Sequence, residues 1–226
     1  MGVDRYFDIV LCIDGTNSMN DIGPDGKSRL DGVKETAKNI GPYLYRRLRN
    51  FGCSLAQLRI RIIVYRDYLS NGGNAMLDTK WFTYPDELRA FESCIDSITA
   101  SGGGDFREDG LEALAYAIKS DWTNKAPIRR HIIVVWTDAD THELGNGKSS
   151  QHYPRGMPKD DVELTAWWDS MNEVSKRLIL FAPDESHWNY ISDNWDNVIH
   201  YPSLAGQGIT DRTFDDVFSS VVAPDF

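Results

Sequence analysis

The chain has 226 residues, of which 41% are hydrophobic and 26% are charged, so it is long enough to bury one sizeable core. No linker divides it, and we therefore predict a single domain over residues 1–226. Its net charge of −10 at pH 7 repels phosphate backbones, which excludes general nucleic-acid binding.

The N-terminal part of the chain predicts a strand followed by a helix. Phe7–Ile13 (FDIVLCI) is almost continuously apolar, which is typical of a parallel strand covered on both faces, and it ends at Asp14. Arg29–Arg49 carries hydrophobic residues at helical spacing, and Ser28 is suited to cap its N-terminus.

Two further strands are predicted next. Leu58–Tyr65 is rich in β-branched residues, and Met76–Tyr84 follows it as a third strand. The intervening Asn71–Asn74 (NGGN) suits a hairpin turn, so we expect the third strand to be antiparallel and to lie at an edge of the sheet.

The rest of the chain continues to alternate between helices and strands. Helices are predicted over Pro85–Ile98 and Glu108–Lys119, on either side of a break at Gly102–Gly104, and His131–Thr137 is the most hydrophobic strand. A helix over Asp160–Glu173 and a strand over Arg177–Ala182 then follow. After them come a short helix over Glu185–Ile191, a weak strand over Val198–Tyr201 and a final helix over Asp211–Val222.

This order of elements predicts the fold class. Alternating strands and helices favour an α/β fold, in which right-handed crossovers place helices on both faces of the sheet. We therefore expect a doubly wound, mostly parallel open sheet with one antiparallel edge strand.

The cysteines and the N-terminal residues indicate the cellular compartment of the protein. Cys12, Cys53 and Cys94 are odd in number and lack metal-type spacing, which fits a reducing compartment. Asp4 and Asp8 stand where a signal peptide needs basic and apolar residues, and no segment has 18 continuous apolar residues. We expect a cytoplasmic protein without a membrane partner.

Three polar segments stand at strand ends or helix entries. They are Asp14–Ser18 (DGTNS), Gly102–Asp105 (GGGD) and Thr137–Asp140 (TDAD). The carboxyl ends of strands in an open α/β sheet meet at one edge, so these segments can converge there. Taken alone, Asp14 is equally suited to cap a turn, but hard oxygen donors without clustered Cys or His suit Mg²⁺, Mn²⁺ or Ca²⁺.

The sequence resembles a known family at two of these segments. DIVLCIDGTNSM, at residues 8–19, resembles the first motif of von Willebrand factor A domains, which forms a metal-ion-dependent adhesion site after an apolar strand. The resemblance implies that Asp14, Thr16 and Ser18 hold the metal, with Thr16 keeping the hydroxyl of the usual serine. IIVVWTDA, at residues 132–139, resembles the last motif and implies Asp138.

The middle motif resembles a particular branch of that family. SGGGDFREDGLEAL, at residues 101–114, is similar to the Gly-Gly-Gly-Asp version found in intracellular and bacterial members, and implies Asp105 as the fifth metal residue. Ser101 is the alternative, because many adhesion-type members have threonine in this motif. IIVYRDY, at residues 62–68, is similar to the same branch, and the whole resemblance covers about residues 5–222.

The resemblance implies a metal-dependent protein-binding adaptor rather than an enzyme. In that family a partner's Asp or Glu completes the coordination of the ion, and intracellular members often act with AAA-type ATPases or with bacterial kinase and phosphatase systems. If Asp14, Asp105 and Asp138 are all ionised, their charges exceed that of a divalent ion. We therefore expect a partner that offers a neutral oxygen or a cation.

Two other functions are open. An Asp-Gly-Thr segment also occurs in haloacid-dehalogenase-type phosphatases, but the nucleophile would then be Cys12, or the general acid Thr16, and neither fits that chemistry. A Mg²⁺- or Mn²⁺-dependent hydrolase that activates water is the enzymatic alternative, although no base is clearly placed. A scaffold with a degenerate metal site is the third possibility.

Residues near the motifs have further expected roles. Asp67 is expected to pair with Arg66 or to cap a loop, and Asp140 to accept hydrogen bonds behind the metal residues. Leu144–Pro158 is long for a connection and follows Asp138 closely, so we expect it beside the metal face, where long loops often carry recognition.

Overall fold

Strand β1 (Asp4–Asp14) is buried along most of its length in the computed structural model, which describes residues 4–203. Ile9 and Leu11 belong to one hydrophobic core, whereas Val10 and Cys12 belong to a second core on the opposite face. Successive side chains of a strand point to opposite faces, so a strand covered on both sides needs apolar residues at every position.

Within residues 4–203 the sheet has seven strands, in the order β3-β2-β1-β6-β8-β9 with β4 also paired to β2. β1 pairs in parallel with β2 (Ser54–Tyr65) and with β6 (Ile128–Trp136). β8 (Lys176–Pro183) and β9 (Val198–Ser203) continue the parallel sheet beyond β6. The predicted doubly wound, mostly parallel sheet is therefore confirmed.

The antiparallel edge consists of two short strands instead of one long strand. β3 (Met76–Asp78) and β4 (Phe82–Tyr84) both pair antiparallel with β2. Between them, the Thr79 hydroxyl accepts a hydrogen bond from the Ile62 backbone N–H at 3.0 Å. A side-chain oxygen here takes the place of a backbone carbonyl, which interrupts the ladder within the predicted strand.

The connection between β2 and β3 is helical, so the predicted hairpin turn is wrong. It forms α2 (Tyr68–Asn71) and then a 3₁₀ turn over Gly72–Asn74. The Asp67 carboxylate accepts hydrogen bonds from the backbone N–H groups of Leu69 and Ser70, at 2.6 and 3.2 Å. An aspartate at this position caps and starts a helical turn, and its predicted capping role is confirmed.

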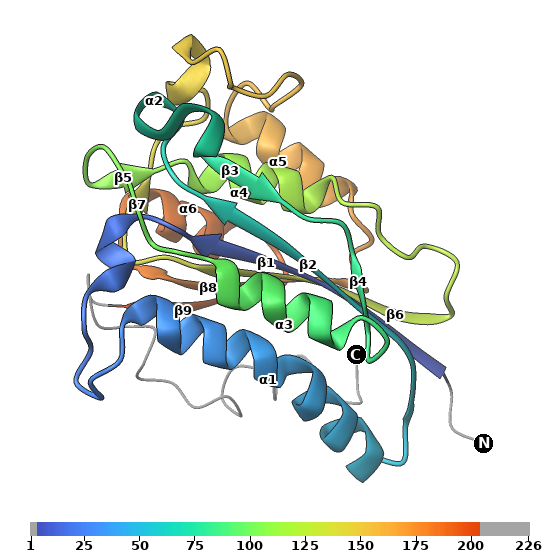
Figure 1. Cartoon of the computed structure of the whole chain (residues 1–226). Helices are drawn as coiled ribbons and strands as arrows, with labels where there is room; N and C mark the ends of the chain where they lie inside the picture. Colours follow the sequence, from blue (N-terminus) through green and yellow to red (C-terminus); the bar gives the residue numbers. More distant parts are fainter. Residues whose placement is uncertain (1–3, 204–226) are drawn as a thin grey trace.

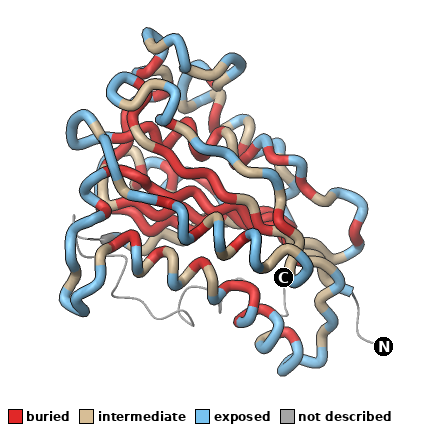
Figure 2. The backbone as a smooth tube through the Cα atoms, viewed as in Figure 1, coloured by how far each residue is buried: buried red, intermediate tan, exposed pale blue. Residues whose placement is uncertain are grey.

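Helices cover both faces of the sheet (Figure 1). α1 (Arg29–Asn50) and α3 (Leu88–Ser97) pack on one face, and α4 (Gly110–Ile118), α5 (Asp161–Ser170) and α6 (Ser186–Asn194) pack on the other. Figure 2 shows the strands as the most continuously buried part of the chain, with exposed residues on the outer sides of the helices. None of the helices within residues 4–203 is long and apolar enough to cross a membrane.

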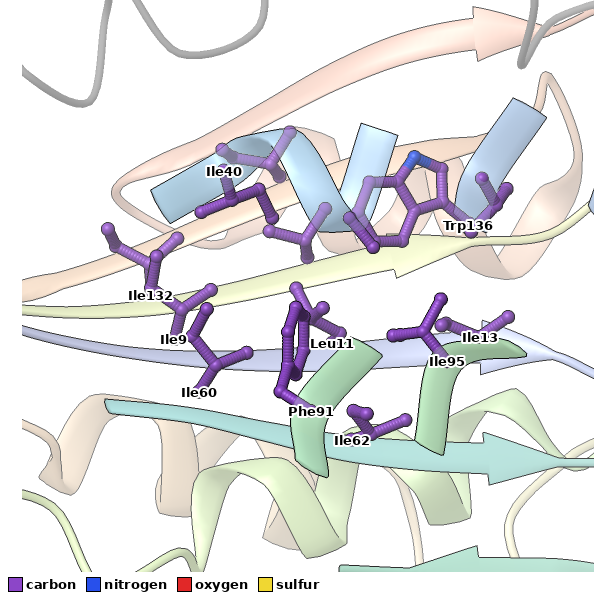
Figure 3. Close-up of a cluster of buried hydrophobic side chains, with 14 of the residues drawn as sticks. Ile9, Leu11, Ile13, Ile40, Ile60, Ile62, Phe91, Ile95, Ile132 and Trp136 are labelled. Atoms are coloured by element: carbon purple, nitrogen blue, oxygen red, sulfur yellow. The ribbon is translucent and has the colours of Figure 1, made fainter. Parts of the chain in front are cut away.

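The core beneath α1 and α3 holds this face together (Figure 3). Ile40 of α1 and Phe91 and Ile95 of α3 pack towards Ile9 and Leu11 of β1, and all five are at most 2% exposed. Burial of each such side chain contributes about 1.5–3 kcal/mol relative to exposure. The packed strands therefore fix the positions of the strand ends at which the polar loops begin.

The predicted final helix at Asp211–Val222 lies outside the described residues.

Candidate metal site

Asp14, Thr16 and Ser18 form a connected set at the end of β1. Asp14 is fully buried, and its Oδ1 accepts hydrogen bonds from the Thr16 backbone N–H at 2.9 Å and from the Thr16 hydroxyl at 2.6 Å. The Thr16 and Ser18 hydroxyl oxygens lie 3.2 Å apart. Alternate residues of the turn thus bring their oxygens together, as the first motif implies.

The loop after β6 joins this set. Thr137 Oγ1 donates to Asp14 Oδ2 at 2.7 Å, and Ser18 Oγ donates to Asp138 Oδ1 at 2.9 Å. The structure therefore brings together Asp14, Thr16, Ser18 and Asp138, four of the five residues assigned from sequence.

The middle loop lies alongside the first loop through its backbone. The Ser101 N–H donates to the Gly15 carbonyl at 2.9 Å, and the Asn17 N–H donates to the Gly102 carbonyl at 3.1 Å. The Ser101 backbone takes part in this pairing, but Ser101 itself is exposed.

The Arg66 guanidinium hydrogen bonds to backbone carbonyls of both the first loop and the middle loop. Its Nε donates to the carbonyls of Gly15 and Ser101, at 2.8 and 3.0 Å, and its Nη2 donates to that of Thr99 at 2.7 Å. A Cβ at Gly15 would lie 2.6 Å from Val64 Cγ1, so the close approach of this loop to β2 requires glycine. Sequence reasoning placed Arg66 in a motif but missed its role.

Asp105 lines the same cleft as Ser18 and Asp138, and its carboxylate contacts His142. Its Oδ1 accepts a hydrogen bond from the Arg107 backbone N–H at 2.8 Å and lies 3.2 Å from His142 Nε2. His142 Nδ1 lies 3.3 Å from the buried carboxylate of Asp109. The hydrogen bond to Asp109, opposed by burial, raises the pKa of His142 to about 9, so its positive charge satisfies Asp105.

Glu108 is a buried acid that sequence reasoning assigned to the start of a helix. Instead, β5 (Arg107–Glu108) pairs in parallel with β7 (Asp140–Thr141), and α4 begins only at Gly110. The Glu108 side chain is buried, and its Oε2 has no hydrogen-bond partner. Burial, followed by the nearby charge of Asp14, raises the pKa of Glu108 to about 9.

Arg29 brings a positive charge to the site. It is the first residue of α1, and its guanidinium forms an ion pair with Asp138 while Nη1 donates to the Ser18 carbonyl at 3.1 Å. Arg29 Nη2 also lies 3.2 Å from Asp21 Oδ2. No local motif marks this residue, because its partners are distant in sequence or are backbone atoms.

The donor set fits a small, hard cation. Burial, and then the charge of Asp138, raises the pKa of Asp14 to about 6, so a bound cation would stabilise its ionised form. Among residues 4–203, no group of three or more His, Cys, Asp or Glu side chains is placed to hold a metal ion. The converging donors are two carboxylates and two hydroxyls, and Mg²⁺ commonly binds one or two carboxylates while keeping several waters.

An open cleft lies beside these donors. Its lining includes Ser18 and Asp138 from the donor set, together with Phe106, Glu108 and Glu185. Phe106 is 95% exposed. A polar site thus opens next to an aromatic side chain that is free to contact another molecule.

Asp140 and the long loop contact other parts of the chain. Asp140 Oδ2 lies 3.2 Å from His187 Nδ1 and 3.3 Å from Arg107 Nη2. Within Leu144–Pro158, the Tyr153 ring packs edge-on against Tyr68 of α2, with centroids 5.3 Å apart. This loop therefore packs against α2, and none of its residues lines the cleft.

Comparisons with known proteins show the fold alone. No family model matches the chain, and no curated protein matches it. The pilus adhesin SpaC from Lactobacillus rhamnosus GG is similar in structure at 15% sequence identity and a TM-score of 0.56, over 96% of this chain and 31% of that one. The PilB minor pilin from Streptococcus sanguinis is similar at 11% identity and a TM-score of 0.57, over 96% of this chain and 61% of that one.

The open conformation of SpaC is similar as well, with a TM-score of 0.53 at 15% identity over 96% of this chain. The chain spans about a third of SpaC and about three fifths of PilB. These matches give no support to the intracellular branch that the middle motif suggested. The observed architecture is a mostly parallel α/β sheet with an antiparallel edge and helices packed on it, and it is like that of a von Willebrand factor A domain.

Proposed function

We propose that this chain is a protein-binding domain that depends on a divalent cation held by Asp14, Thr16, Ser18 and Asp138. The observation that carries the proposal is the hydrogen-bonded link from Asp14 through Thr16 and Ser18 to Asp138, which gathers four oxygen-bearing side chains at one edge of the sheet.

The size of the donor set favours Mg²⁺ or Mn²⁺ over Ca²⁺. Four side chains leave positions on a six-coordinate ion for water or for an oxygen from a partner, whereas Ca²⁺ takes six to eight oxygen ligands. Such an open position is where a bound protein would complete the site.

Arg29 changes the expected chemistry of the partner. A neutral or cationic partner group is expected when three acids face one ion and no positive side chain lies beside them. Arg29 pairs with Asp138 and offsets one of those acids. We therefore propose that the partner contributes a carboxylate, with the exposed Phe106 supplying apolar contact beside it.

The similar structures favour adhesion as the biological setting. One is named a pilus adhesin and another a minor pilin. For this chain we propose adhesive protein recognition in preference to service with an AAA-type ATPase or a kinase and phosphatase system. The cytoplasmic location stays a prediction.

We propose recognition rather than catalysis because His142, which contacts Asp105 of the cleft, is a poor base. His142 lies between the carboxylates of Asp105 and Asp109, and its raised pKa keeps it protonated at neutral pH. A hydrolase needs a group that accepts a proton from water near the ion. Recognition needs only the ion and a complementary surface.

Affinity capture with the purified chain tests this function. The wild-type chain and Asp86→Asn, a change at an exposed carboxylate outside the site, should retain the same proteins in Mg²⁺ and release them in chelator. Asp14→Asn should retain none of these proteins. Retention of the same proteins in the presence of chelator would contradict the proposal. Hydrolysis of a phosphate ester by the wild type, abolished in Asp14→Asn, would also contradict it.

A further inference from the structure

Charge is unevenly distributed along α1. The helix begins at Arg29, which pairs with Asp138 at the candidate metal site, and its 22 residues run along the sheet to the opposite edge, about 30 Å away (Figure 1). Residues 36–66, which include the later part of α1 and all of β2, contain no Asp or Glu. Their basic residues are Lys38, Arg46, Arg47, Arg49, Arg59, Arg61 and Arg66. In a chain with 34 acidic and 24 basic residues, this segment is a local basic region.

Most of these basic side chains have partners within the chain. Lys38, Arg59 and Arg61 form ion pairs with Asp96, Asp8 and Asp78, Arg66 donates to backbone carbonyls, and the Arg47 guanidinium lies 5.0 Å from the centroid of the Phe51 ring. Arg46 and Arg49 differ, because both are exposed and neither forms an ion pair with an acidic side chain of residues 4–203. Their charges are therefore available to another molecule.

Arg46 and Arg49 line a groove of about 480 Å³ between the end of α1 and the start of β2. The rest of its lining is apolar or uncharged and consists of Pro42, Tyr45, Leu48, Asn50, Cys53 and Leu55. Tyr45 is 40% exposed, and Cys53 is half-buried. Asp4 accepts a hydrogen bond from the neighbouring Ser54 hydroxyl at 2.6 Å but does not line the groove. The groove thus combines two positive charges with apolar side chains and includes no acid from the described part of the chain.

The composition of the groove indicates what it binds. Guanidinium groups form strong paired hydrogen bonds with carboxylates, and Tyr and Arg are enriched among the residues that dominate protein–protein binding energy. A ligand that matches both the arginines and the apolar side chains Tyr45 and Leu55 carries carboxylates next to an apolar group, as an acidic peptide segment does. Nucleic acid also carries negative charge, but the net charge of −10 on the whole chain repels it.

We propose that this groove is a second protein-binding surface, which takes an acidic peptide segment that carries an apolar side chain. Carboxylates of the segment pair with Arg46 and Arg49, and its apolar side chain packs against Tyr45 and Leu55. The groove lies at the opposite edge of the sheet from Asp138, so it does not depend on a metal ion. A domain with both sites holds two proteins at once, one at each edge.

Fluorescence anisotropy with a fluorescein-labelled peptide that carries several glutamates around one tryptophan tests this proposal. The assay is done in chelator, and the probe should bind Asp14→Asn as it binds the wild type. Arg46→Glu and Arg49→Glu should each weaken binding about 10-fold or more, because each reverses a charge that faces the peptide. Arg155→Glu is the matched control, since Arg155 is an exposed arginine outside the groove, and it should leave binding within about twofold of the wild type.

The half-buried Cys53 reports where the probe binds. Bound peptide should slow the reaction of Cys53 with N-ethylmaleimide, as measured by mass spectrometry of tryptic fragments, but not that of Cys94, which is half-buried on α3. Each variant should keep the melting temperature of the wild type, because the changed side chains are exposed.

Four results would overturn the proposal. Arg155→Glu could weaken binding as much as Arg49→Glu, or the peptide could bind without protecting Cys53, and either result would place the peptide outside the groove. A peptide of residues 204–226, which contains four aspartates, that binds more tightly than the probe would assign the groove to this chain itself. Self-association of the wild type in sedimentation, abolished by Arg49→Glu, would assign the groove to a second copy.

Discussion

Ser18 Oγ donates a 2.9 Å hydrogen bond to Asp138 Oδ1 across 120 positions of sequence. The two residues belong to the loops that follow β1 and β6, which are neighbouring parallel strands. Because parallel neighbours end at the same edge, this contact is built by the sheet and not by local sequence. It joins the two acidic loops into one site.

Removing the Ser18 hydroxyl should disrupt the site more than the fold. We predict that Ser18→Ala lowers Mn²⁺ affinity about 10-fold and costs about 1 kcal/mol of stability, as expected for one hydrogen bond. Calorimetric titration and urea unfolding measure the two quantities. Ser101→Ala, which alters the alternative residue of the middle motif, should change neither, and an equal loss of affinity in both variants would refute the assignment.

Arg29 should stabilise the metal-free protein by neutralising Asp138. Both side chains of this ion pair are at most 10% exposed. Breaking a buried pair leaves one charge uncompensated, so Arg29→Gln should lower the unfolding free energy in chelator by about 2–4 kcal/mol. Mg²⁺ should restore more stability to this variant than to the wild type, as measured by urea unfolding. An equal response to Mg²⁺ would show that Arg29 and the ion do not share Asp138.

A second buried ion pair should matter for folding alone. Asp8 is 1% exposed, and its carboxylate accepts from Arg59 Nε and Nη2 at 2.8 and 2.7 Å and from the Thr123 N–H at 2.6 Å. Asp8→Ala should cost about 3–5 kcal/mol in urea unfolding without changing Mn²⁺ affinity. Glu35→Gln, which removes an exposed pair with Lys27, should cost less than about 1 kcal/mol. Similar losses in both variants would contradict this ranking.

Glu112 should make stability depend on pH. Burial, and then the charge of Asp109, raises the pKa of Glu112 from its ordinary value of 4.5 to about 7. The folded state therefore holds the proton more tightly than the unfolded state. This contribution is complete below pH 4.5 and is lost as the pH rises through about 7.

Urea unfolding in chelator between pH 5 and 8 measures that contribution. Glu112→Gln keeps an oxygen for the Gly145 N–H and the Tyr153 hydroxyl, so it should remove the slope without removing the contacts. We expect the wild type to lose about 1–3 kcal/mol more than Glu112→Gln over this range. Parallel pH profiles for the two proteins would contradict the expectation.

The strands and the first and last motifs could be predicted because their signals are local. A run such as Phe7–Ile13 is apolar at every position only when both faces are buried, and Asp14, Thr16 and Ser18 follow it directly. Parallel pairing of β1 with β6 then places Asp138 beside them.

The direction of the middle loop could not be predicted in the same way. Gly102 and Gly103 both have positive φ, at 77° and 90°, and the turn they make leads Asp105 towards His142. Sequence identifies glycines that permit such angles but does not fix which angles they adopt. The strand position of Glu108 could not be predicted either. The sequence around it has a helical pattern, although Arg107–Glu108 form a two-residue strand.

The roles of Arg29 and Arg66 were also beyond local patterns. Both are long side chains whose partners include backbone carbonyls in distant loops, and a carbonyl is present at every residue. Only the assembled sheet brings Gly15 and Ser101 within reach of one guanidinium.

Calorimetric titration of the wild-type chain with Mn²⁺ tests the metal site most directly. We predict that a single ion binds, that Asp86→Asn leaves its affinity unchanged, and that Asp14→Asn abolishes binding. The absence of binding at millimolar Mn²⁺, or equal affinity in Asp14→Asn, would contradict the site formed by Asp14, Thr16, Ser18 and Asp138.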